Sequence, residues 1–174
     1  SNADLRNTSW IDCTFDPSTT FEDALMNSAM FGESDLSNVS FSGADLSNAE
    51  IRGSNLSYCS FDATQLINAD FREAHLIASS FQDADLSNVD LSLTNLTRSN
   101  FQGANLRGVD FSETQELCSA TFELGYFDSY TRWPDLWDPI NPFGEDPTDN
   151  VGCRWDSEEE PVPMPAYYVG IDSD

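Results

Sequence analysis

Bulky apolar residues recur at every fifth position along most of this chain. They run without a break from Phe21 to Phe111, which makes nineteen consecutive five-residue units. Two residues before each bulky centre stands a small residue, such as Ala44 before Leu46 or Cys59 before Phe61, and the other three positions are mostly polar. A helix face repeats about every 3.6 residues and a strand face every second residue, so neither element alone explains the pattern.

The bulky centres also repeat with a longer period of twenty residues. One column at this spacing is all phenylalanine: Phe21, Phe41, Phe61, Phe81 and Phe101. The next column is Met26, Leu46, Leu66, Leu86 and Leu106. A unit with one apolar side must stack on copies of itself to bury that side. We therefore predict a four-sided solenoid of short parallel strands about 4.8 Å apart, with a dry interior and a right-handed path.

Several units share a more specific motif. Residues 44–48 and 84–88 read ADLSN, and residues 104–108 read ANLRG. These units resemble the A-(D/N)-L-x-x units of the pentapeptide repeat family. The resemblance implies an all-β fold, the right-handed quadrilateral parallel β-helix of that family. It covers residues 4–127 and is most regular over residues 19–113.

The five-residue spacing slips by one residue near each end of the predicted solenoid. Residues 16–18 (Asp-Pro-Ser) add one residue before Phe21, which predicts a bulged corner in the first coil. After Phe111 the bulky centres move by one residue, to Leu117, Phe122 and Phe127. This phase places Gln115 in a small-residue position, where it would be a poor core residue.

The remaining segments differ in composition from the repeats. Residues 1–3 (Ser-Asn-Ala) resemble the remnant of a cleaved affinity tag. Residues 128–140 are rich in aromatic residues and are predicted to cap the last coil, since the open end of a solenoid must be covered. This segment resembles the T-x-(F/W)-P-x-x-(F/W)-D-P ending found after cyanobacterial pentapeptide repeats. Residues 141–174 are rich in proline and acidic residues, which predicts an irregular tail.

The charge of the chain restricts its partners. There are 31 acidic residues and seven basic ones, giving a net charge of −24. This balance argues against binding to nucleic acid or to anionic membranes, and it fits a protein partner with a basic surface. The ordinary alternative is that the acidity serves solubility alone.

The acidic residues are unevenly distributed over the four predicted faces. Over residues 19–113, the faces centred on Phe21 and Phe31 carry net charges of −4 and −5, and the other two carry −1 and 0. On the Phe31 face, one column of acids repeats every twenty residues: Glu50, Asp70, Asp90 and Asp110. Like charges one coil apart repel, so this column is either relieved by Arg52 and Arg72 or binds a cationic partner. A similar column of asparagines, Asn48, Asn68 and Asn88, is interpreted as structural.

The sequence offers little for catalysis or for metal binding. His75 is the sole histidine and falls at an outward position, and no Cys-x-x-Cys pair is present. We therefore expect no enzymatic activity, no metal and no cofactor. Cys13 and Cys59 fall at small-residue core positions. Cys118 and Cys153 can form a disulfide if the protein is exported to the periplasm or a lumen; without that bond a cytoplasmic location is expected.

Two functions remain open from the sequence. The first is a protein-interaction scaffold, a monomer or weak homodimer with no turnover. The second is implied by the family resemblance, since some pentapeptide repeat proteins bind DNA gyrase or topoisomerase IV as mimics of duplex DNA. Residues 19–113 carry 14 acids and 4 arginines. Their net charge amounts to about one per 2.3 Å of rod, against about one per 1.7 Å for duplex DNA.

Overall fold

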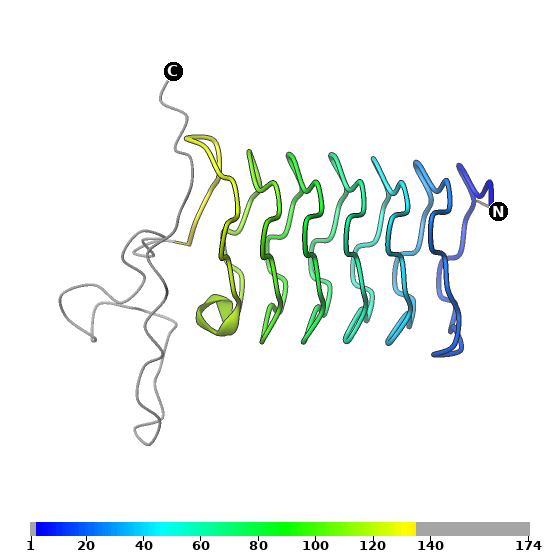
Figure 1. Cartoon of the computed structure of the whole chain (residues 1–174). Coiled ribbons are helices and arrows are strands. Elements are labelled where there is room, and N and C mark those ends of the chain that lie inside the picture. The colour runs from blue at the N-terminus through cyan, green and yellow to red at the C-terminus, as the bar shows by residue number, and fades with distance from the viewer. Residues whose placement is uncertain (1–2, 135–174) are drawn as a thin grey trace.

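The computed structural model describes residues 3–134, which wind into a rod of stacked coils (Figure 1). Parallel bridges join residues twenty apart at four places in each coil, as in Ser40 to Ser60 and Asp45 to Gln65. Over residues 3–134 these contacts are single bridges rather than longer strands, and the one helix is the 3-10 helix η1, Leu117–Ser119. The four-sided parallel solenoid predicted from the repeats is confirmed.

The bulky centres fill the interior as predicted. The phenylalanines of the Phe21 face stack almost parallel, with ring centroids 5.1 Å apart for Phe41 and Phe61 and 4.9 Å apart for Phe61 and Phe81. Phe71 meets the ring of Phe61 edge-on at 5.6 Å. These four side chains have no exposed area. The core is therefore a continuous column of aromatic and aliphatic side chains along the rod axis.

The residue two positions after each centre turns the chain at a corner of the coil. Nearly all of these corner residues adopt the left-handed conformation, with φ of 59° at Asn88 and 68° at Gly108. A Cβ built on Gly108 would lie 2.4 Å from Oδ1 of Asn88 in the preceding coil, so a larger residue at this corner would require the Asn88 side chain to move. The five-residue period is therefore the length of one short bridge plus one tight turn.

The residue just before each centre, called here the bridge position, explains the Asp or Asn of the repeat motif. Its side chain accepts a hydrogen bond from the backbone N–H two residues later, as from Ser47 to Asp45 (3.1 Å) and from Ser87 to Asp85 (3.0 Å). Asn100 accepts the amide of Gln102 in the same way at 3.0 Å. A short side chain with an acceptor oxygen suits this turn, and both Asp and Asn supply one.

The small-residue positions contain buried hydroxyl groups that join neighbouring coils. Thr64 Oγ1 donates to the carbonyl of Phe41 at 2.9 Å, and Ser54 and Ser79 donate to the carbonyls of Phe31 and Leu56, both at 2.7 Å. The thiol of Cys59 donates to the carbonyl of Leu36 at 3.0 Å. Polar side chains thus enter the core without an unsatisfied donor.

Replacing Thr64 by valine tests this contribution. Valine keeps the shape of threonine but loses the hydrogen bond to Phe41, so we expect the free energy of unfolding to fall by about 1 kcal/mol. Thr64→Ser keeps the hydroxyl and serves as the control. Urea unfolding of both variants measures the difference; equal stability of Thr64→Val and wild type would contradict this role.

The two predicted slips in the repeat are present. The bridges span 21 residues before the corner at 16–18, as in Thr14 to Asp35, and 20 after it, as in Thr20 to Ser40. A second extra residue enters at Glu116, with φ of 58°, just before η1. The small-residue placement of Gln115 was wrong: Gln115 occupies an exposed bridge position, paired with Asn95. Thr114 takes the small position instead, and its hydroxyl donates to the carbonyl of Phe111 at 2.8 Å.

The bridge pattern continues to Arg132, which pairs with Asp110. Trp133 then stacks on Phe111, with ring centroids 4.7 Å apart and planes 6° apart, and so extends the interior column of the Phe31 face. Thr131 donates its hydroxyl to the carbonyl of Leu106 at 2.9 Å, as the other small-position hydroxyls do. The rest of the predicted cap, residues 135–140, and the predicted tail, 141–174, lie outside the described residues.

Candidate functional site

The acidic column predicted from the sequence is formed in the structure. Parallel bridges join Glu50 to Asp70, Asp70 to Asp90 and Asp90 to Asp110, so the four carboxylates stand in consecutive coils in the middle of the Phe31 face. Met30 precedes them in the same column and Arg132 follows them. Sequence spacing alone was sufficient to bring these residues together, because the coil length is constant between them.

Arginine side chains neutralise most of this column. Arg72 binds both carboxylate oxygens of Asp70, at 2.8 and 2.5 Å, and its Nε lies 3.7 Å from Asp90. Arg132 pairs with Asp110 at 2.6 Å. The hydrogen bonds from Arg72 hold the pKa of Asp70 below its usual range, against the opposing effect of partial burial. Of the two alternatives left open by the sequence, Arg72 follows the first, relief of the column by arginine, whereas Arg52 does not.

A pH titration tests the Arg72 contact. Because the pKa of Asp70 is depressed in the folded state, its contribution to stability is present above the unfolded value of about 3.9 and is lost as the pH falls through the folded value. We expect Arg72→Gln to raise the pKa of Asp70 measured by carbon NMR. The variant should also be less stable than wild type at pH 7, by less than about 1 kcal/mol for so exposed a pair. If the titration midpoint of Asp70 were the same in this variant as in wild type, Arg72 would not be the cause of the lowered pKa.

Glu50 differs from the other three acids of the column. Arg52, the arginine expected beside it, turns to Glu73 in the next coil and forms an ion pair there. Among residues 3–134, no ion pair involves Glu50. The other three acids each accept a hydrogen bond from the backbone N–H two residues later, at 3.1 Å for Asp70, 3.0 Å for Asp90 and 2.9 Å for Asp110. Glu50 is exposed and has no corresponding bond in the described structure.

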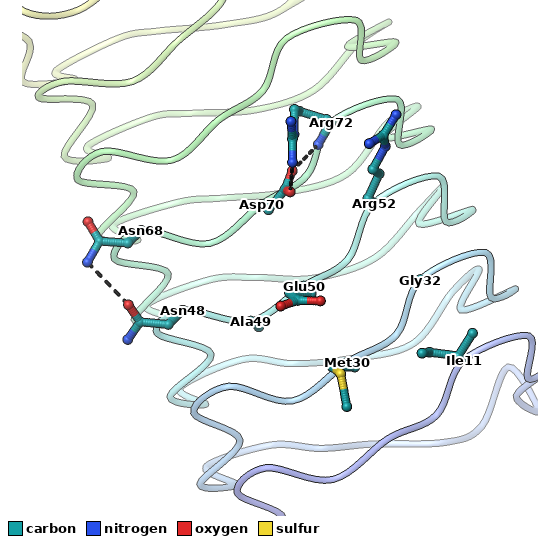
Figure 2. Close-up of a pocket in the computed structure, with 10 residues that line it drawn as sticks. All are labelled: Ile11, Met30, Gly32, Asn48, Ala49, Glu50, Arg52, Asn68, Asp70 and Arg72. Atoms are coloured by element: carbon teal, nitrogen blue, oxygen red, sulfur yellow. Dashed lines mark hydrogen bonds and ion pairs between the residues drawn. The ribbon is translucent and has the colours of Figure 1, made fainter.

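A groove of about 520 Å³ surrounds Glu50 on the Phe31 face (Figure 2). The asparagine corner runs along one side, with Asn48 and Asn68, and Arg52 and Arg72 lie on the other. Toward the N-terminal coils the groove is lined by Gly32 and by the apolar side chains of Met30 and Ile11. Sequence reasoning missed this groove, although one signal was present: residue 32 is glycine where the next two coils carry Arg52 and Arg72.

The asparagine column has the structural role predicted for it. Asn68 Nδ2 donates to Oδ1 of Asn48 at 3.4 Å, and Asn88 Nδ2 donates to Oδ1 of Asn68 at 3.3 Å. On the second acidic face, centred on Phe21, two carboxylates are bound locally: Ser40 donates to Glu22 at 3.1 Å, and Ser80 donates to Asp62 at 2.5 Å. Many of the acids on both faces thus serve the stack itself.

The remaining reactive side chains are placed as follows. His75 is exposed at a bridge position between Asn55 and Asn95, outward as predicted. Cys59 is buried in its core position, and burial raises the pKa of its thiol to about 12, which keeps it unreactive at neutral pH. Cys13 is half-buried. Cys118 belongs to η1, but Cys153 lies outside the described residues, so the disulfide stays a prediction.

No three or more His, Cys, Asp or Glu side chains of residues 3–134 are arranged to hold a metal ion. Nor does the same region contain a helix with the length and apolar character that a membrane span requires.

Comparison with known proteins identifies the family. The family model for pentapeptide repeats in eight copies matches residues 19–57, and the model for the pentapeptide repeat region matches residues 54–128. Together they cover more than half of the chain. None of the curated proteins matches this sequence.

Solved structures agree with this assignment. One is HetL, a pentapeptide repeat protein involved in heterocyst differentiation regulation from the cyanobacterium Nostoc sp. strain PCC 7120. HetL is 23% identical to this chain, with a TM-score of 0.55. The match covers 73% of this chain and 56% of HetL, so this chain spans little more than half of that protein. Another is QnrB1, a plasmid-mediated fluoroquinolone resistance protein, 22% identical at a TM-score of 0.51, over 75% of this chain and 79% of QnrB1.

These likenesses show the fold. Pentapeptide repeat proteins are known as right-handed quadrilateral β-helices, and the bridges twenty residues apart and the four-sided core described above have that form. The chain belongs to the pentapeptide repeat family.

Proposed function

We propose that this protein is a non-enzymatic interaction scaffold, a rigid rod whose Phe31 face binds another protein. The observation that carries the proposal is the combination, on this face, of a regular column of charged side chains with a groove around Glu50, which forms no ion pair within residues 3–134. A stack held by bridges in every coil presents these groups at fixed spacing, which lowers the entropy lost when a partner binds. The partner is expected to be a protein with a basic surface, and the role requires no cofactor, nucleic acid or membrane.

Site-specific cross-linking tests this proposal. A photoreactive p-benzoylphenylalanine replaces Asp90 on the Phe31 face, and in a matched variant it replaces His75 at the bridge position of the neighbouring Leu36 face. In extract of the native host, a discrete adduct is expected from the Asp90 position alone. Because the expected contact is partly electrostatic, the yield should fall as the salt concentration rises. Adducts from neither position, or equal adducts from both, would contradict a binding role for this face.

A second candidate, mimicry of duplex DNA toward gyrase, is supported by the stacked acidic column and by the fold shared with QnrB1. The structure also gives an opposing consideration, because Arg72 and Arg132 neutralise Asp70 and Asp110. The test changes Glu50, Asp70, Asp90 and Asp110 together to their amides. Asn95 and Asn100 already occupy bridge positions and accept turn amides there, so this variant should fold. Salt-sensitive gyrase binding that the amide variant loses would support mimicry, and no binding by wild type would exclude it.

The cellular location is proposed on the condition that the predicted disulfide forms. If Cys118 and Cys153 are joined, the protein works outside the cytoplasm. Mass spectrometry of the unreduced protein, made in an oxidising compartment, should then show the peptides of both cysteines linked. Two reduced thiols would remove the support for export.

A further inference from the structure

The groove on the Phe31 face is not a by-product of backbone requirements. Gly32, which lines it, does not have a positive φ. A Cβ built on Gly32 would meet only the carbonyl oxygen of Arg52, at an ordinary contact distance of 3.5 Å. The equivalent positions in the next two coils are Arg52 and Arg72. The backbone therefore accepts a side chain at residue 32, and its absence opens the groove toward Met30 and Ile11.

The groove has one charged group available to a ligand. Four charged side chains line it, and three of them are engaged: Arg52 with Glu73, and Arg72 with Asp70. Glu50 is left, with no ion pair among the described residues and an exposed side chain. Figure 2 shows its carboxylate between the two walls of the groove, apart from both arginines. A cationic group entering here would meet a carboxylate without displacing an existing partner.

An apolar surface adjoins this carboxylate. Met30 occupies the bridge position one coil before Glu50, and Ile11, which is 53% exposed, lines the groove one coil farther toward the N-terminus. Because these apolar side chains line the same groove as the Glu50 carboxylate, the groove offers a mixed surface on which an aliphatic group and a cation can both bind.

We propose that the groove binds an extended segment of a partner protein in which an aliphatic residue is followed, two positions later, by arginine or lysine. In an extended chain these two side chains point the same way about 6.6 Å apart, close to the distance of one to two coils, about 4.8 Å each. The aliphatic side chain lies on Met30 and Ile11, and the cation pairs with Glu50. This inference rests on the proposed scaffold role and names the chemistry of the partner.

Nuclear magnetic resonance with a synthetic peptide tests the inference directly. The probe is acetyl-Ala-Leu-Ser-Arg-Ala-amide, titrated into the isotope-labelled full chain at low salt. Amide shifts are expected at Gly32, Glu50 and Arg52, with a Kd on the order of 1 mM for so short a segment. Peptides with Gln in place of Arg, or with Ser in place of Leu, should each bind more weakly than the probe.

Two variants locate the peptide. Glu50→Gln should weaken binding by about threefold, as expected for one partly exposed ion pair. Gly32→Leu fills the groove where the backbone tolerates a side chain. It should therefore abolish saturable binding of the peptide and leave the thermal unfolding midpoint of the protein unchanged. Glu123→Gln removes the same charge from the Phe21 face and should leave the affinity unaltered.

The inference is overturned if the peptide shifts none of these amides, if it shifts those of another face, or if Gly32→Leu binds it as tightly as wild type does. Cross-linking separates this failure from failure of the scaffold role. An adduct at the Asp90 position that persists in Gly32→Leu would leave the Phe31 face as a binding surface and reject the groove. A homodimer adduct in that experiment would identify a second copy as the occupant and would also reject a basic partner.

Discussion

Replacing Phe61 by alanine is expected to lower the free energy of unfolding by about 3 to 5 kcal/mol. The side chain has no exposed area, stacks on Phe41 and Phe81 in the adjacent coils, and meets Phe71 edge-on. Alanine would lose the transfer free energy of the ring and leave a cavity in the middle of the stack. The coils cannot collapse into that cavity, because their spacing is fixed by bridges on all four sides.

Urea unfolding followed by circular dichroism measures this loss. The matched control is Tyr58→Ala, since Tyr58 is also aromatic but is 62% exposed at a corner. That variant should change stability by less than about 0.5 kcal/mol. Similar losses for the two variants would mean that the aromatic column contributes no more than a surface ring does.

The opposite change, Ala44→Leu, is expected to destabilise the protein by about 1 to 3 kcal/mol. Ala44 has no exposed area, and its backbone is held on two sides, with its N–H donating to Phe41 at 2.9 Å and its carbonyl accepting from Gln65 at 2.9 Å. A larger side chain cannot move outward without breaking these bonds. It must therefore displace the neighbouring centres, which are already packed across the interior.

Ala63→Leu is the control for this change. Ala63 is exposed at a corner with φ of 55°, and leucine already occupies equivalent corners at Leu93 and Leu124, with φ of 62° and 58°. We expect its unfolding midpoint in urea to stay close to that of wild type. If Ala44→Leu were equally well tolerated, the small-residue positions would contain unfilled space, and the pairing of one large with one small inward residue would not be needed.

These predictions depend on the part of the structure that the sequence specified best. The centres and small positions were predictable because burial selects size and polarity at each step of a constant repeat, as Phe61 and Ala44 illustrate. The slips at residues 16–18 and after Phe111 were also visible in the spacing, but a third extra residue, between Tyr126 and Arg132, was not. The error at Gln115 has a physical reason: the extra residue enters after it, at Glu116, rather than before it. Spacing alone cannot place an insertion within a turn.

The candidate site was only half predictable. The stacking of Glu50, Asp70, Asp90 and Asp110 followed from the period alone, but the direction of each arginine did not. Arg72 folds back on Asp70 within its own unit, whereas Arg52 reaches Glu73 in the next coil. Long flexible side chains on a flat surface have several partners within reach, so only the structure could show that Glu50 lacks an ion pair within residues 3–134.

The constant coil length has a consequence for insertions and deletions. Each five-residue unit is one side of the coil, so losing a single unit between Glu50 and Asp70 would turn everything after it by a quarter of a revolution. Asp70, Asp90 and Asp110 would then lie over a different face from Glu50, and phenylalanine centres would meet leucine centres inside. Loss of twenty residues would shorten the rod and leave every face aligned. Length variants of this protein that keep its surface should therefore differ by whole coils.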